Sequence, residues 1–216
     1  MGFLDFFTGD TPPLIKEAID NVQAMLNNGR DMFAAAAAHL LDNEILEVDL
    51  LALDRDINQR EQTLRRVVLE HLTIDPKREL VLCLKLISIV QEAERIGDLA
   101  KMLGRAARLA QKPRMGPHVE PLRVIRSRIL RMFDQTRDGF VEGDASVAQH
   151  LMEEQPKIKA DLTQYVRLLA DDADVTPNEA VVYTLSARTM SRVSSHLANI
   201  ASTVTSPFDQ IRRGTV

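Results

Sequence analysis

Apolar residues recur three and four positions apart over most of the 216-residue chain, a spacing that places them on one face of a helix. The stretches with this spacing are long, and short polar connectors separate them. When each stretch is followed to its capping and helix-breaking residues, the pattern predicts six long helices and favours no strand. Their expected ranges are 13–40, 43–73, 76–111, 118–142, 145–171 and 177–205. The sequence therefore predicts an all-α protein.

The expected third helix carries the most regular pattern. Its apolar and small residues alternate by four and three positions, which is typical of a seam packed between neighbouring helices. They are Leu82, Leu86, Ile89, Ala93, Ile96, Ala100, Leu103, Ala107 and Ala110. The expected sixth helix takes the same step at Met190, Val193, Leu197, Ile200 and Val204. The two helices are thus predicted to occupy equivalent places in two related units.

Short sequence matches support an internal repeat of about half the chain. Residues 30–33 read Arg-Asp-Met-Phe and residues 137–140 read Arg-Asp-Gly-Phe. The join is expected at residues 111–117, because two prolines and a glycine in seven residues interrupt a helix. We therefore expect two tandem three-helix bundles, with residues 1–112 in the first unit and 113–216 in the second.

The third helix of each unit begins with a similar sequence. Asp75 precedes Pro76, and Thr176 precedes Pro177 with Glu179 two residues later. A capping side chain followed by proline predicts a helix start at that proline, and the glutamate completes a capping box.

Charge gives no sign of a nucleic-acid partner. The net charge is -4, whereas proteins that bind nucleic acids usually present a concentrated basic face. The local basic run consists of Arg123, Arg126, Arg128 and Arg131. On a helix these side chains spread over several faces, so we expect a solvated surface there.

Cysteine usage and hydropathy indicate a cytoplasmic protein. Cys83 is the sole cysteine and lies in an apolar run, so burial is expected and an intrachain disulfide is impossible. No apolar span of 18 residues is found, and residues 1–7 lack the basic start of a signal peptide. These first residues include four large apolar side chains, for which an exposed hydrophobic hook and a segment folded back on the core are equally open interpretations.

Two carboxylates in the third helix are candidates for cation binding. Glu94 and Asp98 are four residues apart, on one helix face, where like charges repel. A bound cation would reverse this repulsion. The alternative interpretation is a solvated acidic edge with Arg95 or Lys101 as its counter-ions.

A second oxygen-bearing stripe in the expected second helix strengthens the cation hypothesis. It consists of Asp54, Asn58 and Glu61, and an antiparallel neighbour would bring it level with Glu94 and Asp98. Hard oxygen ligands suit oxidised iron, manganese, magnesium or calcium, and suit structural zinc less well.

The five histidines form no metal-binding pair on a helix and are expected to be surface or packing residues: His39, His71, His118, His150 and His196.

These motifs carry a family resemblance. Residues 75–100, with their proline near the start and the run Glu-Arg-Ile-Gly-Asp at 94–98, resemble the signature helix of PhoU proteins. Residues 53–61 are similar to the second-helix motif of that family. The resemblance implies metal sites on acidic helix faces, and by position these fall on Glu94, Asp98 and Asp54, with Asn58 and Glu61 as further candidates.

The resemblance also implies a role and partners. PhoU proteins restrain phosphate uptake from the cytoplasm by contact with a phosphate transporter and its histidine-kinase sensor. A homodimer is a candidate assembly, and membrane association is expected only through partners.

In the second unit, Ser191 and Ser195 replace the acidic motif and residues 155–159 replace the other stripe. A metal site is therefore expected in the first unit alone, or nowhere.

We expect a regulator rather than an enzyme, because the sequence shows no nucleophile beside a base and no glycine-rich phosphate loop. One alternative is a metal-binding helical-bundle protein, for which paired Glu-x-x-His motifs would be typical. The other alternative is an adaptor for a sodium-coupled phosphate carrier.

Overall fold

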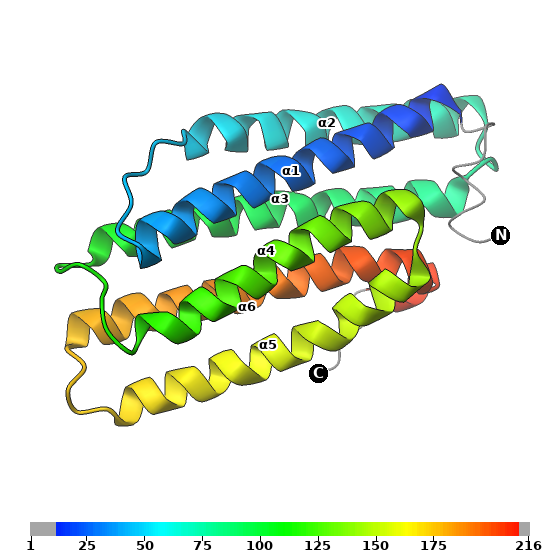
Figure 1. Cartoon of the computed structure of the whole chain (residues 1–216). Coiled ribbons are helices and arrows are strands. Elements are labelled where there is room, and N and C mark those ends of the chain that lie inside the picture. The colour runs from blue at the N-terminus through cyan, green and yellow to red at the C-terminus, as the bar shows by residue number, and fades with distance from the viewer. Residues whose placement is uncertain (1–11, 212–216) are drawn as a thin grey trace.

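The computed structural model describes residues 12–211, which form six long helices (Figure 1). The helices are α1 (Pro13–Leu41), α2 (Leu50–Ile74), α3 (Leu80–Leu109), α4 (Val119–Glu142), α5 (Ala145–Asp171) and α6 (Pro177–Thr205). A short 3-10 helix, η2 (Phe208–Gln210), follows. No strand occurs within residues 12–211, and the predicted all-α class is confirmed.

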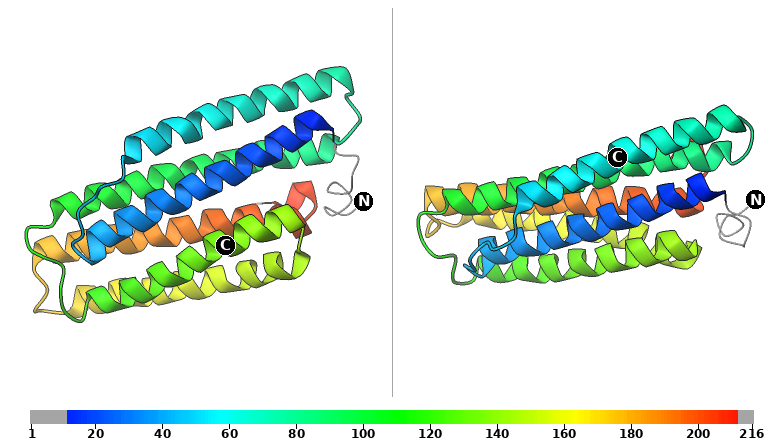
Figure 2. Two further views of the ribbon diagram at one scale, coloured as in Figure 1. Left: turned by 45° about the horizontal axis from the view of Figure 1, so that its top comes forward. Right: turned by 90° about the horizontal axis from the view of Figure 1, so that it is seen from above.

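The helices form two groups of three that run along one long direction. Figures 1 and 2 show α1, α2 and α3 in one group and α4, α5 and α6 in the other. The groups join where α3 packs on α6 and α1 packs on α4. The predicted pair of three-helix bundles is confirmed. The buried apolar side chains of both groups form one continuous core, and the boundary expected after residue 112 falls in the connection between α3 and α4.

The predicted seams line this shared core. Eight of the nine seam residues of α3, from Leu82 to Ala107, are buried, and Ala110 at its end is half-buried. All five seam residues of α6, from Met190 to Val204, are also buried. The four-and-three spacing therefore located the two central helices correctly.

The two predicted starts of the third helices have different outcomes. The Thr176 capping box is confirmed, since its hydroxyl accepts the Glu179 N–H and the Glu179 carboxylate accepts the Thr176 N–H. The start at Pro76 was wrong, because α3 begins at Leu80. The Arg78 N–H points to both the carbonyl and the side chain of Asp75, which closes a turn instead of a helix.

The expected start of α2 at residue 43 was also wrong. The helix begins at Leu50, where the Asp49 carboxylate accepts the N–H groups of Leu51 and Ala52. This cap satisfies the free amides of the first turn. Residues 43–49 therefore serve as the α1–α2 connection.

The basic run of α4 is not a solvated surface, and that expectation was wrong for three of its four arginines. Arg123 and Arg126 both contact the Asp42 carboxylate at the end of α1. Arg128 contacts Glu154 and Asp161 of α5. Only Arg131 is exposed in the way expected. The run thus connects α4 to two neighbouring helices, because carboxylates that are distant in sequence lie opposite it.

Three further expectations concern burial and the membrane. Cys83 is fully buried, and burial raises the pKa of its thiol to about 11. Within residues 12–211, no helix combines the length and the apolar character needed to cross a membrane. The hydrophobic segment at residues 1–7 lies outside the described residues.

Candidate functional site

The predicted acidic residues of α2 and α3 lie close together, because the two helices are antiparallel neighbours (Figure 1). The Lys101 ammonium bridges the helices. Its Nζ lies 2.7 Å from Asp54 Oδ1 in α2 and 2.8 Å from Asp98 Oδ1 in its own helix. Lys101 and Asp54 are mostly buried, with 16% and 14% of their side-chain surfaces exposed, whereas Asp98 is 54% exposed.

Glu94 and Glu61 complete this acidic face, which we define as Asp54 and Glu61 of α2 with Glu94 and Asp98 of α3. Burial raises the pKa of Glu94, and the negative charges of Asp98 and Glu61 raise it further, while Lys101 acts in the opposite direction. Glu61 accepts two hydrogen bonds from Arg65, the shorter at 2.8 Å. The acidic side chains therefore converge as the sequence predicted.

Asn58 is half-buried one helical turn beyond Asp54. It is the one candidate ligand without a charge, so it adds no repulsion to the acidic face. Its amide oxygen is the type of ligand that hard cations accept.

Gly97 sets how closely the two helices approach. A Cβ atom at this position would lie 3.0 Å from Ile57 Cδ1 and 3.7 Å from Asp54 Oδ1. The missing side chain leaves room for Ile57 to enter the α3 surface, and this contact holds Asp54 level with Asp98. The glycine of the Glu-Arg-Ile-Gly-Asp run thus lies directly against Ile57 and Asp54 of α2.

The donor set, as arranged, fits an ammonium rather than a metal ion. Among residues 12–211, no group of three or more His, Cys, Asp or Glu side chains is arranged to hold a metal ion. The Lys101 Nζ atom lies between Asp54 and Asp98 and contacts both carboxylates. Metal binding by the five candidate residues stays a prediction.

The equivalent place in the second unit holds a neutral contact. The Gln155 side-chain amide of α5 donates to Ser195 Oγ of α6 at 2.9 Å. The Ser195 hydroxyl in turn donates to the Ser191 carbonyl at 3.0 Å. An amide and a hydroxyl therefore connect α5 to α6 without any carboxylate.

A buried polar cluster, which the sequence pattern did not predict, connects the units. Glu92 of α3 is 2% exposed and its Oε2 lies 2.7 Å from His196 Nδ1 of α6. The same Oε2 accepts a hydrogen bond of 2.8 Å from the Asn199 amide. The sequence feature that could have predicted this cluster is Glu92, a carboxylate directly before the buried seam residue Ala93. His196 was expected to be a surface or packing residue, and the structure buries it against Glu92, a partner that the sequence did not predict.

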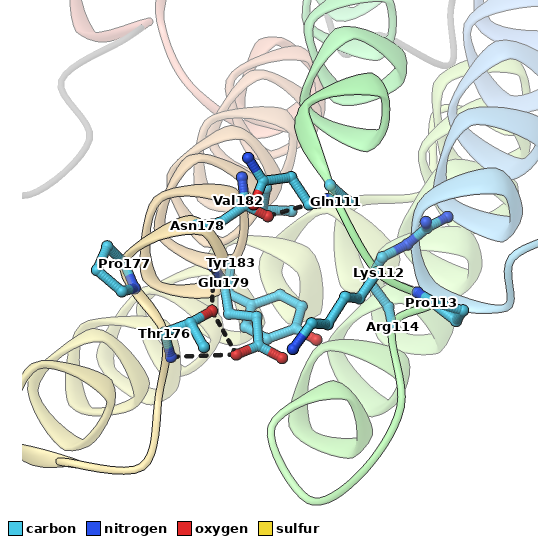
Figure 3. A pocket seen from close by; sticks show the side chains of 11 residues that line it. Gln111, Lys112, Pro113, Arg114, Thr176, Pro177, Asn178, Glu179, Val182 and Tyr183 are labelled. Atoms are coloured by element: carbon cyan, nitrogen blue, oxygen red, sulfur yellow. Dashed lines mark hydrogen bonds between the residues drawn. The ribbon is translucent and has the colours of Figure 1, made fainter.

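A pocket of about 380 Å³ lies between the α3–α4 connection and the first turns of α6 (Figure 3). Figure 3 shows the Lys112 amine, the Glu179 carboxylate and the Tyr183 hydroxyl directed toward the same part of it. Burial raises the pKa of the Tyr183 hydroxyl, and the charge of Glu179 adds to the increase. Prolines 113 and 177 and Val182 supply apolar lining. The volume and mixed lining suit a small molecule with polar and apolar parts.

Paired asparagine contacts fix the walls of this pocket. Asn178 donates to the Leu109 carbonyl at 2.9 Å and accepts the Gln111 N–H at 3.1 Å. Asn43 makes a similar pair with the backbone of Arg114, at 3.1 and 2.8 Å. The sequence predicted the join at 111–117 but not the pocket, because its two walls are more than 60 residues apart in the chain.

Comparison with known proteins identifies a domain and a fold. Residues 122–204 match the family model of the PhoU domain. The structure is similar to that of PhoU from Pseudomonas aeruginosa, with a TM-score of 0.82 and 22% sequence identity over 94% of this chain and 98% of the other. It is also similar to the phosphate transport system regulatory protein PhoU from Streptococcus pneumoniae, with a TM-score of 0.79 and 16% identity over 93% and 95% of the two chains. A comparison with curated proteins finds no match.

The predicted resemblance to PhoU proteins is confirmed. The matched region lies in the second unit, whereas the motifs that suggested the resemblance lie in the first. The structural likeness extends over both units and shows that they share one PhoU-type fold.

Proposed function

We propose, on the premise that this chain carries a PhoU domain within a complete PhoU-type fold, that it is a cytoplasmic, non-enzymatic regulator of phosphate uptake. It acts by contact with a phosphate transporter, with the transporter's histidine-kinase sensor, or with both. The match of residues 122–204 to the PhoU domain is the observation that carries this proposal. One of the similar structures is itself described as a phosphate transport system regulatory protein.

The state of the nucleophilic side chains supports a role without catalysis. The Cys83 thiol is fully buried with a pKa raised to about 11, which keeps it protonated and unreactive at neutral pH. Ser186 and Thr189 donate to carbonyls of their own helix, at 2.6 and 2.8 Å. These groups are occupied by structural contacts, so binding surfaces are the better candidates for function.

Deletion of the gene tests the regulatory role. Loss of the protein should derepress phosphate-starvation genes or cause phosphate over-accumulation, measured with a starvation reporter and labelled phosphate uptake in rich and poor medium. Regulation by contact also requires that binding to the transporter or kinase change with phosphate supply. A deletion strain that matches its parent in both media would remove this proposal and favour the adaptor for a sodium-coupled carrier.

A pair of surface variants tests whether the region around the acidic face is the docking site. Arg95 is exposed between Glu94 and Asp98 on α3, and Arg131 is exposed on α4. Arg95→Glu should mimic the deletion while leaving the melting temperature unchanged, because it alters surface charge without removing a core contact. Arg131→Glu is the matched control and should behave like the wild type. If both variants restore normal phosphate control, docking occurs elsewhere on the protein.

A further inference from the structure

The acidic face presents a charge problem that the fold has to solve. Four carboxylates from two helices lie on it, and Glu61 has Arg65 as its partner. Asp54 is mostly buried, and a carboxylate in such a place needs a counter-charge to offset its lost hydration. A bound cation is one solution, and a protein side chain is another.

The position of Lys101 gives it the geometry of a bridging cation. It lies three residues after Asp98, so α3 supplies both a carboxylate and its counter-ion on one face. Its Nζ contacts oxygens of both helices at 2.7 and 2.8 Å, distances typical of charge-assisted hydrogen bonds. An ammonium also has three donors and no acceptor, which suits a site lined by carboxylate oxygens.

Charge coupling at this site agrees with the geometry. Burial acts to lower the pKa of Lys101, but the hydrogen bonds and charges of Asp54 and Asp98 outweigh it and raise the pKa. The ammonium therefore stays charged throughout the physiological range. Lys101 also opposes the upward shift in the pKa of Glu94.

We propose that the Lys101 ammonium is the resident cation of the acidic face, and that it bridges Asp54 of α2 and Asp98 of α3 in place of a metal ion. In this chain, the first unit then folds and stays folded without a metal at Asp54 and Asp98. The inference concerns only the isolated protein and does not depend on its role in phosphate control.

The native protein provides the first test. The full chain is purified, treated with chelator, and titrated with Mn²⁺, Mg²⁺ and Ca²⁺ while the melting temperature is followed; bound Mn²⁺ is counted by electron paramagnetic resonance. The proposal expects an unchanged melting temperature and no stoichiometric Mn²⁺. One tightly bound Mn²⁺ per chain that disappears in Asp98→Asn would overturn it, because the metal would then displace the ammonium.

Removal of the ammonium provides the second test. Lys101→Gln should lower the melting temperature by about 4 °C, because Asp54 loses its counter-ion. Mn²⁺ should restore this loss in the variant while leaving the wild type unchanged. Lys101→Arg keeps a cation and should remain insensitive to Mn²⁺.

The matched control for the second test is Lys157→Gln in α5. The native Lys157 side chain is exposed, and its ammonium lies 3.7 Å from the Glu154 carboxylate. It should melt like the wild type with or without Mn²⁺. A Lys101→Gln variant that melts like this control, and that Mn²⁺ does not stabilise, would refute the bridging role.

Discussion

The two units use the same place in their bundles in different ways. Between α2 and α3, the mostly buried Asp54 reaches across to Lys101, which also contacts Asp98. Between α5 and α6, Gln155 donates to Ser195, and both groups are neutral. Each contact joins the outer helix of a unit to its central helix, and each replaces hydration lost on packing.

This difference shows that the same scaffold accommodates either a charged or a neutral polar contact at this place. A carboxylate there requires a cation, because an unpaired buried charge is far more costly than an unpaired amide. An amide and a hydroxyl satisfy each other directly. The stability of the charged contact in the first unit therefore depends on the cation that neutralises Asp54 and Asp98. The neutral contact in the second unit has no such dependence.

The largest expected effect lies where the units meet. Glu92→Ala should destabilise the protein by about 3 kcal/mol, because it leaves His196 and Asn199 without their buried acceptor. Urea denaturation measures this cost. Glu92→Gln retains an acceptor oxygen and should cost less. A loss no larger than that of the exposed control Glu70→Ala would show that the units do not depend on this cluster.

The next largest loss of stability is expected at the two inter-helix contacts, which can be compared directly. Asp54→Ala should cost about 2 kcal/mol and Gln155→Ala about 1 kcal/mol, because hydrogen bonds to charged groups contribute more than neutral ones. The double variant should show the sum of the two losses, since the contacts share no partner. Urea denaturation of the three variants checks the order and the additivity. Equal losses at the two sites would contradict the distinction drawn between the units.

The smallest expected effect is a gain in stability. At neutral pH, Glu94→Gln should stabilise the protein by about 0.3 kcal/mol, because it removes repulsion from Asp98 and Glu61. The pKa of Glu94 is raised above its ordinary value of 4.5, so the unfolded chain releases this proton at lower pH than the folded chain does. The penalty is therefore absent below that value and grows as the pH rises through the folded-state pKa.

Thermal unfolding of Glu94→Gln at pH 4 and pH 7 measures this dependence, with the exposed Glu70→Gln as its control. The advantage over the wild type should appear at pH 7 and shrink at pH 4. An advantage of equal size at both pH values would point to packing rather than charge.

The sequence by itself determined the all-α class, the six helices, the two seams and the capping box at Thr176. These features depend on residues within a few turns of one another, so periodicity and capping chemistry are sufficient to predict them. The convergence of Asp54 with Glu94 and Asp98 was also predictable, because a short connection makes α2 and α3 antiparallel neighbours.

Only the tertiary structure showed which basic side chain lies between Asp54 and Asp98 and how the two units join. The sequence left Arg95 and Lys101 as alternative counter-ions, and in the structure Lys101 contacts Asp54 across the helix pair whereas Arg95 is exposed. Glu92 and His196 are 104 residues apart, as are Arg30 and Asp134 across the same interface. Pairings at such separation depend on how whole helices rotate and shift against one another, and local sequence patterns contain no information about that.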